Sequence, residues 1–171
     1  MAMIPTLLGA VGDLAVYGGI PEDFFDSWAC LEDCHSSFFA DDSGIHDRAS
    51  FEKFCRRKVL DVAVSREASG RIVCAGYIIP EARYAACFHG YCAPKYRSPD
   101  ISIPCARLGL RYFFRRYGFE RISVLGRWGN RVARLYAMRQ GFTIEGRLRS
   151  YLRHKGQFVD AYFGSMLKGE V

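Results

Sequence analysis

The sequence predicts a single-domain α/β fold. Segments with strand and helix patterns alternate along all 171 residues, and no linker, internal repeat or low-complexity tract interrupts them. Half of the residues are hydrophobic and 15% are aromatic, which is typical of a chain that buries a proper core and not of a disordered one. The sharpest local signal, a capped helix between two strands, lies in the last quarter. We therefore expect one domain over residues 1–171.

The chain is predicted to begin with a strand and a helix. Residues 6–16 favour a strand, although Gly9 and Gly12 weaken it. Pro21 suits the first position of a helix, and the acidic residues after it favour a helix N-terminus. Aromatic and aliphatic residues then recur at helical spacing. This first helix is predicted to run to about Phe39.

The middle of the chain is predicted to form a second helix and a hairpin. A short helix over residues 50–58 has Ser50 as its expected N-cap. Strands over 60–64 and 71–79 follow, and the polar stretch 67–70 between them ends in glycine. This pattern is typical of a β-hairpin.

A further strand and a long helix are predicted next. Residues 84–93 form the strand, and the helix ends near Gly118. Pro104 lacks an N–H group and is not expected deep inside a helix. The helix is therefore predicted to begin nearer Ser102 than Ser98.

The last quarter has the best-defined elements. Residues 121–125 have a β pattern, and Asn130 is a good N-cap because its side-chain oxygen can accept from a first-turn N–H. Gly141 supplies the left-handed conformation that ends many helices, and Phe142 then opens a new strand. Between the caps, larger side chains follow at helical spacing: Val132, Leu135 and Tyr136.

This succession of strand, capped helix, Gly-Phe and strand resembles the C-terminal half of the GNAT acyltransferases. The resemblance is good from about Tyr91 onward and continues through Glu145-Gly146-Arg147, Gly156 and Asp160. It is similar to the branch that acetylates ribosomal protein N-termini and small amines. The predicted order β-α-α-β-β-β-α-β-α-β-β is that of the GNAT fold. This implies a mixed, mostly antiparallel sheet with helices on both faces.

The resemblance implies a loop that binds the pyrophosphate of acetyl-CoA, and this chain departs from its pattern. Family members use Gln/Arg-x-x-Gly-x-Gly/Ala at a helix N-terminus, where free N–H groups meet phosphate oxygens. Arg97 takes the first place, but Asp100 and Ser102 replace the glycines. The Asp100 carboxylate would repel phosphate. In this degenerate loop Arg97, Ser98 and Ser102 are expected to hold phosphate by their side chains, and the alternative is that cofactor binding has been lost.

The resemblance also assigns roles around the thioester. In the family, a splayed strand exposes backbone amides to the pantetheine arm, and these fall on Tyr91, Cys92 and Ala93. Asn130 matches the residue that caps the next helix and contacts the arm. Tyr136 matches the tyrosine that protonates the leaving thiolate, and its alternative role is a core aromatic.

A general base is harder to identify. Residues 84–92 contain no carboxylate, although many family members place a glutamate on this strand. His89, with a near-neutral pKa, is the candidate for taking the proton of the amine, and a structural histidine is the alternative. Cys92 is expected in the core rather than as a nucleophile. Enzymes of this fold can use a water chain, so the missing carboxylate does not exclude catalysis.

Charge is distributed unevenly along the sequence. The net charge is +6, with acidic residues concentrated in the first third and arginines in the C-terminal half. This asymmetry suits a nucleotide, a nucleic acid or an acidic protein, and solvated helix faces explain it equally well. A phosphate-bearing cofactor would attract the same charge, and no motif supports nucleic acid as a partner.

Cysteine usage and hydropathy favour a cytoplasmic protein. The seven cysteines are an odd number scattered through predicted elements, so we expect small core hydrophobes in a reducing compartment and no disulfide framework. No apolar run approaches the roughly 20 residues of a membrane span, and no signal peptide is expected. Cys30, Cys34 and His35 lack a fourth ligand, so no metal site is expected.

Two functions follow as hypotheses. The leading one is an acyl-CoA-dependent N-acyltransferase that acetylates a protein N-terminus, a lysine or a small amine. The alternative is a catalytically silent GNAT-fold component of a homo-oligomer or larger assembly, such as a viral particle. The degenerate loop and missing carboxylate support that alternative. An open cleft between the strands near Ala93 and Arg121 would favour the enzyme, and a cleft plugged by Tyr96 or Trp128 would favour the scaffold.

Overall fold

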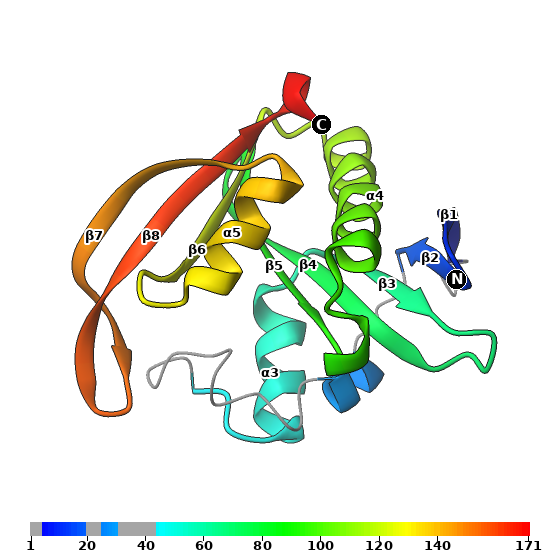
Figure 1. Cartoon of the computed structure of the whole chain (residues 1–171), viewed down its shortest axis with the longest axis horizontal. Coiled ribbons are helices and arrows are strands. Elements are labelled where there is room, and N and C mark those ends of the chain that lie inside the picture. Colours follow the sequence, from blue (N-terminus) through cyan, green and yellow to red (C-terminus); the bar gives the residue numbers. More distant parts are fainter. Residues whose placement is uncertain (1–4, 20–24, 31–43) are drawn as a thin grey trace.

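A computed structural model describes residues 5–19, 25–30 and 44–171 of the chain (Figure 1). Within them lies one eight-stranded sheet of order β1-β2-β3-β4-β5-β6-β8-β7. Neighbouring strands are antiparallel except β5 and β6, which are parallel. The strands are β1 (Thr6–Val11), β2 (Leu14–Gly18), β3 (Asp61–Arg66), β4 (Ile72–Ala82), β5 (Ala85–Cys92), β6 (Arg121–Arg127), β7 (Thr143–His154) and β8 (Gln157–Leu167).

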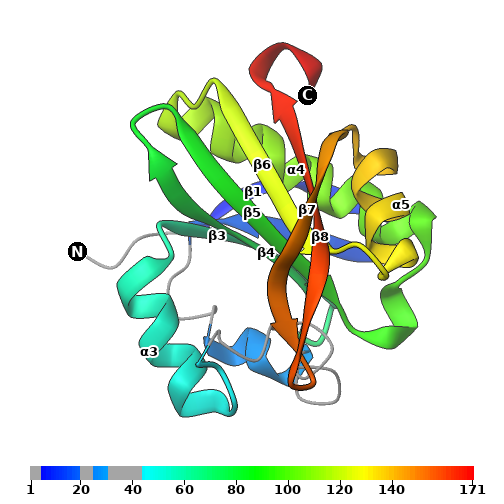
Figure 2. The same cartoon turned by 90° about the vertical axis from the view of Figure 1, so that its left-hand side faces the viewer.

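Helices cover both faces of the sheet (Figures 1 and 2). On one face lie α4 (Pro99–Tyr117) and α5 (Arg131–Gln140), and on the other lie α3 (Arg48–Lys58) and the short η1 (Ser27–Cys30). Two further single turns are η3 (Pro94–Tyr96) and η4 (Lys168–Glu170). The mixed, mostly antiparallel sheet with helices on both sides confirms the predicted fold class.

Each face of the sheet has its own apolar core. On the α4 side, Phe113 and Ile122 are fully buried in a cluster that also contains residues of α5. On the α3 side, Phe51 and Tyr77 are fully buried against η1 and the central strands. Burying one such side chain contributes roughly 1.5–3 kcal/mol, so the two cores hold the central strands rigidly between them.

The central strands diverge, and this divergence positions the site. β5 and β6 pair only over Ala85↔Arg121, Ala86↔Ile122 and Cys87↔Ser123. Beyond these pairs each strand continues, β5 against β4 and β6 against β8. The facing edges of β5 and β6 therefore separate into an open wedge.

Most of the predicted elements from residue 60 onward are confirmed. The hairpin of β3 and β4, strand β5 and strand β6 lie where the patterns place them. Asn130 caps α5 by accepting from the backbone N–H of Ala133 at 3.2 Å, and Gly141 ends the helix at φ 112°. The strands next to Ile122 and Phe142 belong to one sheet, as expected, with β8 between them.

Two predictions in the first third of the chain are wrong. Residues 6–16 form a hairpin and not one strand, because Gly12 at φ +55° allows a tight turn between β1 and β2. The N-cap of α3 is Asp47, and Ser50 instead occupies the third helical position of a capping box. The predicted helix to Phe39 lies largely outside the described residues; within its range the structure describes Phe25 and Asp26 as helical, followed by η1.

The start of α4 also corrects the prediction. The helix begins at Pro99 with Ser98 as N-cap, and Pro104 lies inside it. The N–H that Pro104 lacks would have bonded the carbonyl of Asp100 in the exposed first turn. Solvent can serve that carbonyl, which is why the helix tolerates the proline.

Candidate active site

A cavity of about 850 Å³ opens where β5 and β6 diverge. Gly76 and Phe88 line it on the α4 side of the sheet, and Tyr77 and His89 line it on the α3 side. Consecutive residues of a strand point to opposite faces, so a cavity lined by both sets passes through the sheet at the wedge. A molecule bound here can therefore meet a second molecule approaching from the opposite face.

Most of the predicted site residues share this cavity. Its wall includes the catalytic candidates and most of the cofactor-binding candidates: Tyr136, His89, Tyr91, Cys92, Arg97, Ser102 and Asn130. Ala93 and Ser98 lie outside the wall. Residues far apart in the sequence are brought together because β5, the N-terminus of α4 and α5 all border the wedge.

Tyr136 reaches the cavity from α5. Its side chain is half-buried, and within the described part of the chain no group forms a hydrogen bond with its hydroxyl. Asn130 lines the same wall while its side-chain oxygen caps the helix. Asn130 is the N-cap of α5 and Tyr136 lies within the same helix, so α5 fixes their relative position.

The strand amides differ from those predicted. The N–H of Ala93 donates to the Val73 carbonyl at 2.8 Å and so points away from the wedge. Backbone groups alternate between the two edges of a strand, which directs the amide of Tyr91 toward β4 as well. Of the predicted trio, Cys92 alone presents its N–H to the wedge, and Gly90 presents its N–H in the same way. The register of β5 against β4, which the sequence leaves open, decides which of its N–H groups face the wedge.

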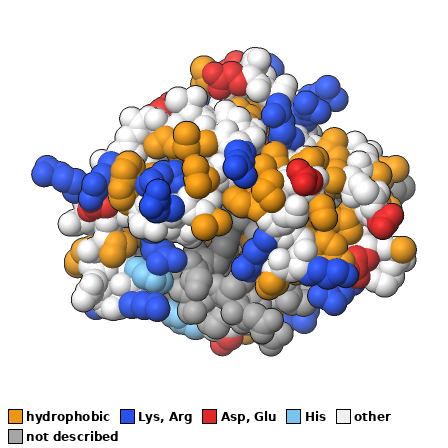
Figure 3. Space-filling view, in the orientation of Figure 1, with side chains coloured by type: hydrophobic (Ala, Val, Ile, Leu, Met, Phe, Trp, Pro, Cys, Tyr) orange, Lys and Arg blue, Asp and Glu red, His pale blue; other side chains and the backbone are white. Residues whose placement is uncertain are grey.

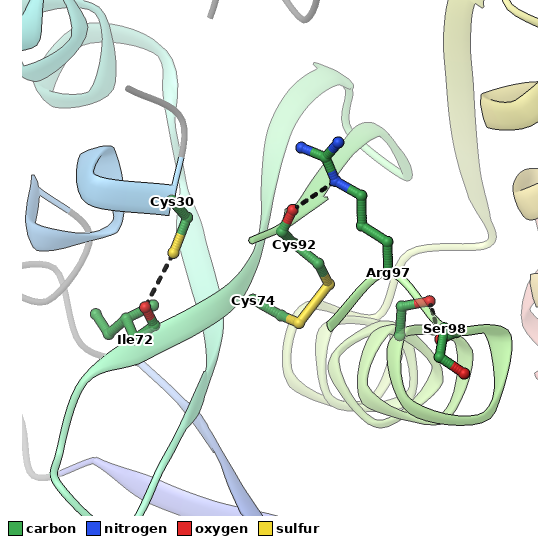
Figure 4. Close-up of a disulfide and its surroundings, with 7 residues drawn as sticks. Cys30, Ile72, Cys74, Cys92, Arg97 and Ser98 are labelled. Atoms are coloured by element: carbon green, nitrogen blue, oxygen red, sulfur yellow. Dashed lines mark hydrogen bonds between the residues drawn. A yellow bond between two sulfur atoms is a disulfide. The ribbon is translucent and has the colours of Figure 1, made fainter. Parts of the chain in front are cut away.

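The predicted phosphate loop is only partly available for a ligand (Figure 4). Arg97 reaches back along the strand end, and its Nε donates to the Cys92 carbonyl at 3.0 Å. The Ser102 hydroxyl donates to the Ser98 carbonyl at 2.8 Å, so the helix itself uses this donor. That carbonyl also accepts from the backbone N–H groups of Ile101 and Ser102. Exposed Asp100 lies in the same turn and outside the cavity wall.

A disulfide joins Cys74 and Cys92 across β4 and β5 (Figure 4). The two residues are direct cross-strand partners with Cα atoms 4.0 Å apart. The expectation of no disulfide is wrong for this pair, because strand register, and not sequence spacing, brings the sulfurs together. Cys92 therefore borders the cavity as a disulfide and not as a free thiol. The other described cysteines are buried and free, as predicted: Cys30, Cys55, Cys87 and Cys105.

His89 lies half-buried on the α3 side of the cavity. Its ring stacks on Tyr77 with centroids 5.0 Å apart, and its Nε2 lies 3.5 Å from the Cys87 sulfur. Burial lowers the pKa of His89 from 6.5 to about 4, so the expected near-neutral value is wrong. The imidazole is uncharged at neutral pH. It can accept a proton only briefly, because its conjugate acid is strong.

Polar groups that the sequence prediction missed continue from His89. Burial raises the pKa of the Cys87 thiol to about 11, while the neighbouring Ser123 hydroxyl acts to lower it. Ser123 is fully buried on β6, and its hydroxyl donates to Glu81 Oε2 at 2.8 Å. Glu81 itself is exposed. The predicted strand ended at residue 79, so nothing in the sequence connected this carboxylate with Ser123.

The residues expected to plug a repurposed cleft lie elsewhere. The Tyr96 hydroxyl donates to Glu67, and Arg134 and Arg147 stack on Trp128 with centroid distances of 4.2 and 5.0 Å. Neither aromatic ring borders the cavity. Neither side chain therefore plugs the wedge.

The charged residues in the described part of the cavity wall are basic. Arg97 and Arg127 are in its wall, and no carboxylate is among the wall residues that the structure describes. Figure 3 shows Lys and Arg side chains spread over the face that carries α4 and α5. A cationic mouth with an apolar interior suits a ligand with an anionic end and a long uncharged arm.

Neither a metal site nor a spanning helix is found in the described ranges. Among residues 5–19, 25–30 and 44–171, no three His, Cys, Asp or Glu side chains are grouped to hold a metal ion. Cys30 donates its thiol to the Ile72 carbonyl at 3.0 Å (Figure 4), and Cys34 and His35 lie outside the described residues. No helix in the same ranges is long and apolar enough to cross a membrane.

Solved structures with the same fold are acetyltransferases. A chimera of spermidine N-acetyltransferase SpeG from Vibrio cholerae and hSSAT is 15% identical, with a TM-score of 0.73 over 92% of this chain and 96% of that chain. A GNAT-family acetyltransferase from Bacillus anthracis is 13% identical, with a TM-score of 0.69 over 98% of this chain and 100% of that chain. A probable GNAT-family acetyltransferase from Chromobacterium violaceum is 18% identical, with a TM-score of 0.74 over 99% of this chain and 90% of that chain.

Sequence comparison adds no closer relative. No protein-family profile matches the chain, and no protein of curated function matches it. The structural similarities extend over nearly the whole of each chain at low identity. They establish the GNAT fold for this protein.

Proposed function

We propose that this protein is an acetyl-CoA-dependent N-acyltransferase. The observation that carries the proposal is the open cavity through the sheet, with Tyr136 and Asn130 on one wall and the unpaired edge of β5 on the other. A catalytically silent scaffold has no need to keep a cavity of about 850 Å³ at this position. The shared fold of known acetyltransferases supports the same function.

The wall suits the pantetheine arm and thioester better than the pyrophosphate. Beyond its pairing with β6, the β5 edge offers the N–H groups of Gly90 and Cys92 to an extended arm, as one strand does to another. At the mouth, Arg97 supplies the positive charge. The Ser98 carbonyl already accepts from the N–H groups of Ile101 and Ser102 in the first turn of α4, so these donors are not free for phosphate. Asp100 adds a negative charge in the same turn. The cofactor is therefore held mainly by its arm, and we expect modest affinity for CoA.

The chemistry is direct transfer of the acetyl group. A neutral amine attacks the thioester carbon, and strand amides at the wedge stabilise the developing negative charge on oxygen. The carbon–sulfur bond then breaks, and the Tyr136 hydroxyl gives its proton to the departing sulfur. Tyr136 suits this role because it borders the cavity and its hydroxyl is not used by a described neighbour.

The acceptor enters from the α3 side. That part of the wall is apolar and aromatic, and it contains Phe54, Tyr77, Ile79 and Tyr91. Within the described wall no carboxylate faces a second ammonium group. Among protein N-termini, lysines and small amines, the wall thus favours one amine on an apolar or aromatic group over a polyamine. Burying an unpaired extra charge would cost several kcal/mol.

Calorimetric titration with acetyl-CoA tests the cofactor, and CoA release with a panel of amines tests the reaction. Phenethylamine, a peptide with an apolar N-terminal residue, lysine and spermidine form a suitable panel. We expect acetyl-CoA binding and a higher kcat/KM for the apolar amines than for spermidine. Undetectable acetyl-CoA binding at millimolar concentration would overturn the proposal and favour the scaffold.

A further inference from the structure

Acetyl transfer to an ammonium must release a proton. When the acceptor starts as R–NH3⁺, the products are the amide, CoA as a thiol and one proton. Tyr136 regains its own proton from the amine nitrogen after transfer, so a second proton still has to leave. The described cavity wall contains no carboxylate that could take it.

A continuous row of four polar side chains leads from the cavity to the surface. His89 borders the cavity, and its Nε2 lies 3.5 Å from the sulfur of Cys87. Ser123 is the direct cross-strand partner of Cys87 on β6, so the two side chains lie side by side on the same face of the sheet. The Ser123 hydroxyl donates to Glu81 Oε2 at 2.8 Å, and Glu81 is exposed at the far end. The His89–Cys87 and Ser123–Glu81 distances lie within hydrogen-bonding reach.

We propose that His89, Cys87, Ser123 and Glu81 form a proton exit path from the acceptor side of the cavity to solvent. The assignment rests on the proposed acyltransferase function. It makes His89 the catalytic residue that touches the amine and makes Cys87, Ser123 and Glu81 relay residues that act through it.

The relay balances without any further reactant. In the tautomer that donates Nε2–H to Cys87, the lone pair on Nδ1 takes the proton of the ammonium. The Nε2 proton passes to the Cys87 sulfur as the S–H proton passes to Ser123 Oγ and the hydroxyl proton passes to the Glu81 carboxylate. His89, Cys87 and Ser123 end neutral. Glu81 then releases the proton to water, and the amine is left neutral for attack on the thioester.

The protonation states at rest suit this direction. With its pKa lowered to about 4 by burial, His89 does not retain the proton. With its pKa raised to about 11, Cys87 is present as the thiol and can both accept and donate. A thiolate–imidazolium pair, as in a cysteine nucleophile, is disfavoured by the same two shifts. The pair therefore serves proton transfer and not covalent catalysis.

The test uses the Glu81→Gln variant with a fast amine substrate. At low buffer concentration we expect a loss of about 10-fold or more in kcat, with the KM for acetyl-CoA unchanged. Raising the concentration of a small buffer such as imidazole should restore the rate of Glu81→Gln and leave the wild type unaffected. Glu145→Gln is the matched control, because Glu145 also accepts from a buried serine, Ser165, at 2.6 Å but lies away from the cavity.

Ser123→Ala and His89→Ala extend the test. Ser123→Ala breaks the row in the middle and should show the same buffer-dependent rate, while imidazole should rescue His89→Ala by replacing the missing ring. A wild-type rate in Glu81→Gln at every buffer concentration would overturn the relay while leaving the acyltransferase intact. Absence of acetyl-CoA binding or turnover in the wild type would instead overturn the proposed function and the relay with it.

Discussion

At the scale of single residues, Tyr136 has the firmest claim to a chemical role. Asn130 and Gly141 fix both ends of α5, and the helix then presents Tyr136 to the cavity. Its ring is half-buried and is not part of the central apolar cluster, so packing alone does not explain it. The residue is placed where a departing thiolate would need a proton.

Tyr136→Phe removes the hydroxyl and keeps the ring. We expect kcat to fall by roughly 10²-fold or more with little change in acetyl-CoA affinity, because the proton donor acts only in the transition state. Steady-state kinetics together with calorimetry measure the two quantities. Equal turnover in both proteins would reduce Tyr136 to a packing residue.

Asp100→Gly removes a carboxylate beside the mouth of the cavity. The affinity for CoA should rise, because the negative charge near phosphate is lost and the backbone can approach more closely. Asp100→Asn is the matched control, since it removes the charge and retains the side chain. An affinity below that of the wild type in both variants would show that the phosphates bind elsewhere.

His89 should make the folded protein sensitive to acid. Its pKa is lowered from 6.5 to about 4, so between these values the unfolded chain binds a proton that the folded chain excludes. Stability from this group is complete above about pH 6.5 and falls as the pH drops toward 4, by about 2–3 kcal/mol. Urea unfolding at several pH values compares the wild type with His89→Gln. Parallel losses in the two proteins would contradict a buried neutral histidine.

At the scale of elements, α4 lies unusually close to the sheet at one glycine. A Cβ built on Gly109 would lie 2.9 Å from the Cβ of Ala63 on β3. Gly109 and Ala63 both border the cavity, so this approach sets the position of α4 relative to the wedge. The spacing of glycine in the sequence gave no indication of the contact.

Gly109→Ala should therefore destabilise the protein, although alanine favours helix by about 1 kcal/mol. The clash should outweigh this gain, since overpacking typically costs about 1–3 kcal/mol. Adding Ala63→Gly removes the opposing methyl and should recover most of the loss in a double-mutant cycle. Additive effects of the two substitutions on the free energy of unfolding would argue against direct contact.

At the scale of the whole molecule, the sheet is held together across its centre by more than backbone pairing. The Cys74–Cys92 disulfide joins β4 to β5 at the end where β5 leaves β6. It encloses a sequence separation of 18 residues. The wedge is therefore braced on its β4 side, while its β6 side stays open.

Reduction of this disulfide should lower the free energy of unfolding by about 3 kcal/mol, as expected for a loop of this length. Denaturant curves with and without reductant measure the difference. Cys74→Ser/Cys92→Ser supplies the control, because reductant should leave its stability unchanged. A wild-type protein equally indifferent to reductant would show that the bond contributes nothing to stability.

The sequence by itself determined the local structure and the order of elements. Caps, glycine stops and alternating patterns depend on residues close together in the chain, so the α5 ends at Asn130 and Gly141 could be predicted. The same locality explains the errors. Gly12 was interpreted as a weak strand residue, although it forms a turn. Ser50 was interpreted as the N-cap of α3, although Asp47 takes that position and Ser50 completes the capping box.

Only the tertiary structure decided which groups meet. Strand register joined Cys74 to Cys92, and strand phase turned the Ala93 amide away from the wedge. The parallel pairing of β5 with β6 set Cys87 beside Ser123, which in turn reaches Glu81. These contacts depend on how distant segments pack against each other, and a one-residue shift in register would reverse every face. The local sequence pattern does not specify the register between distant strands.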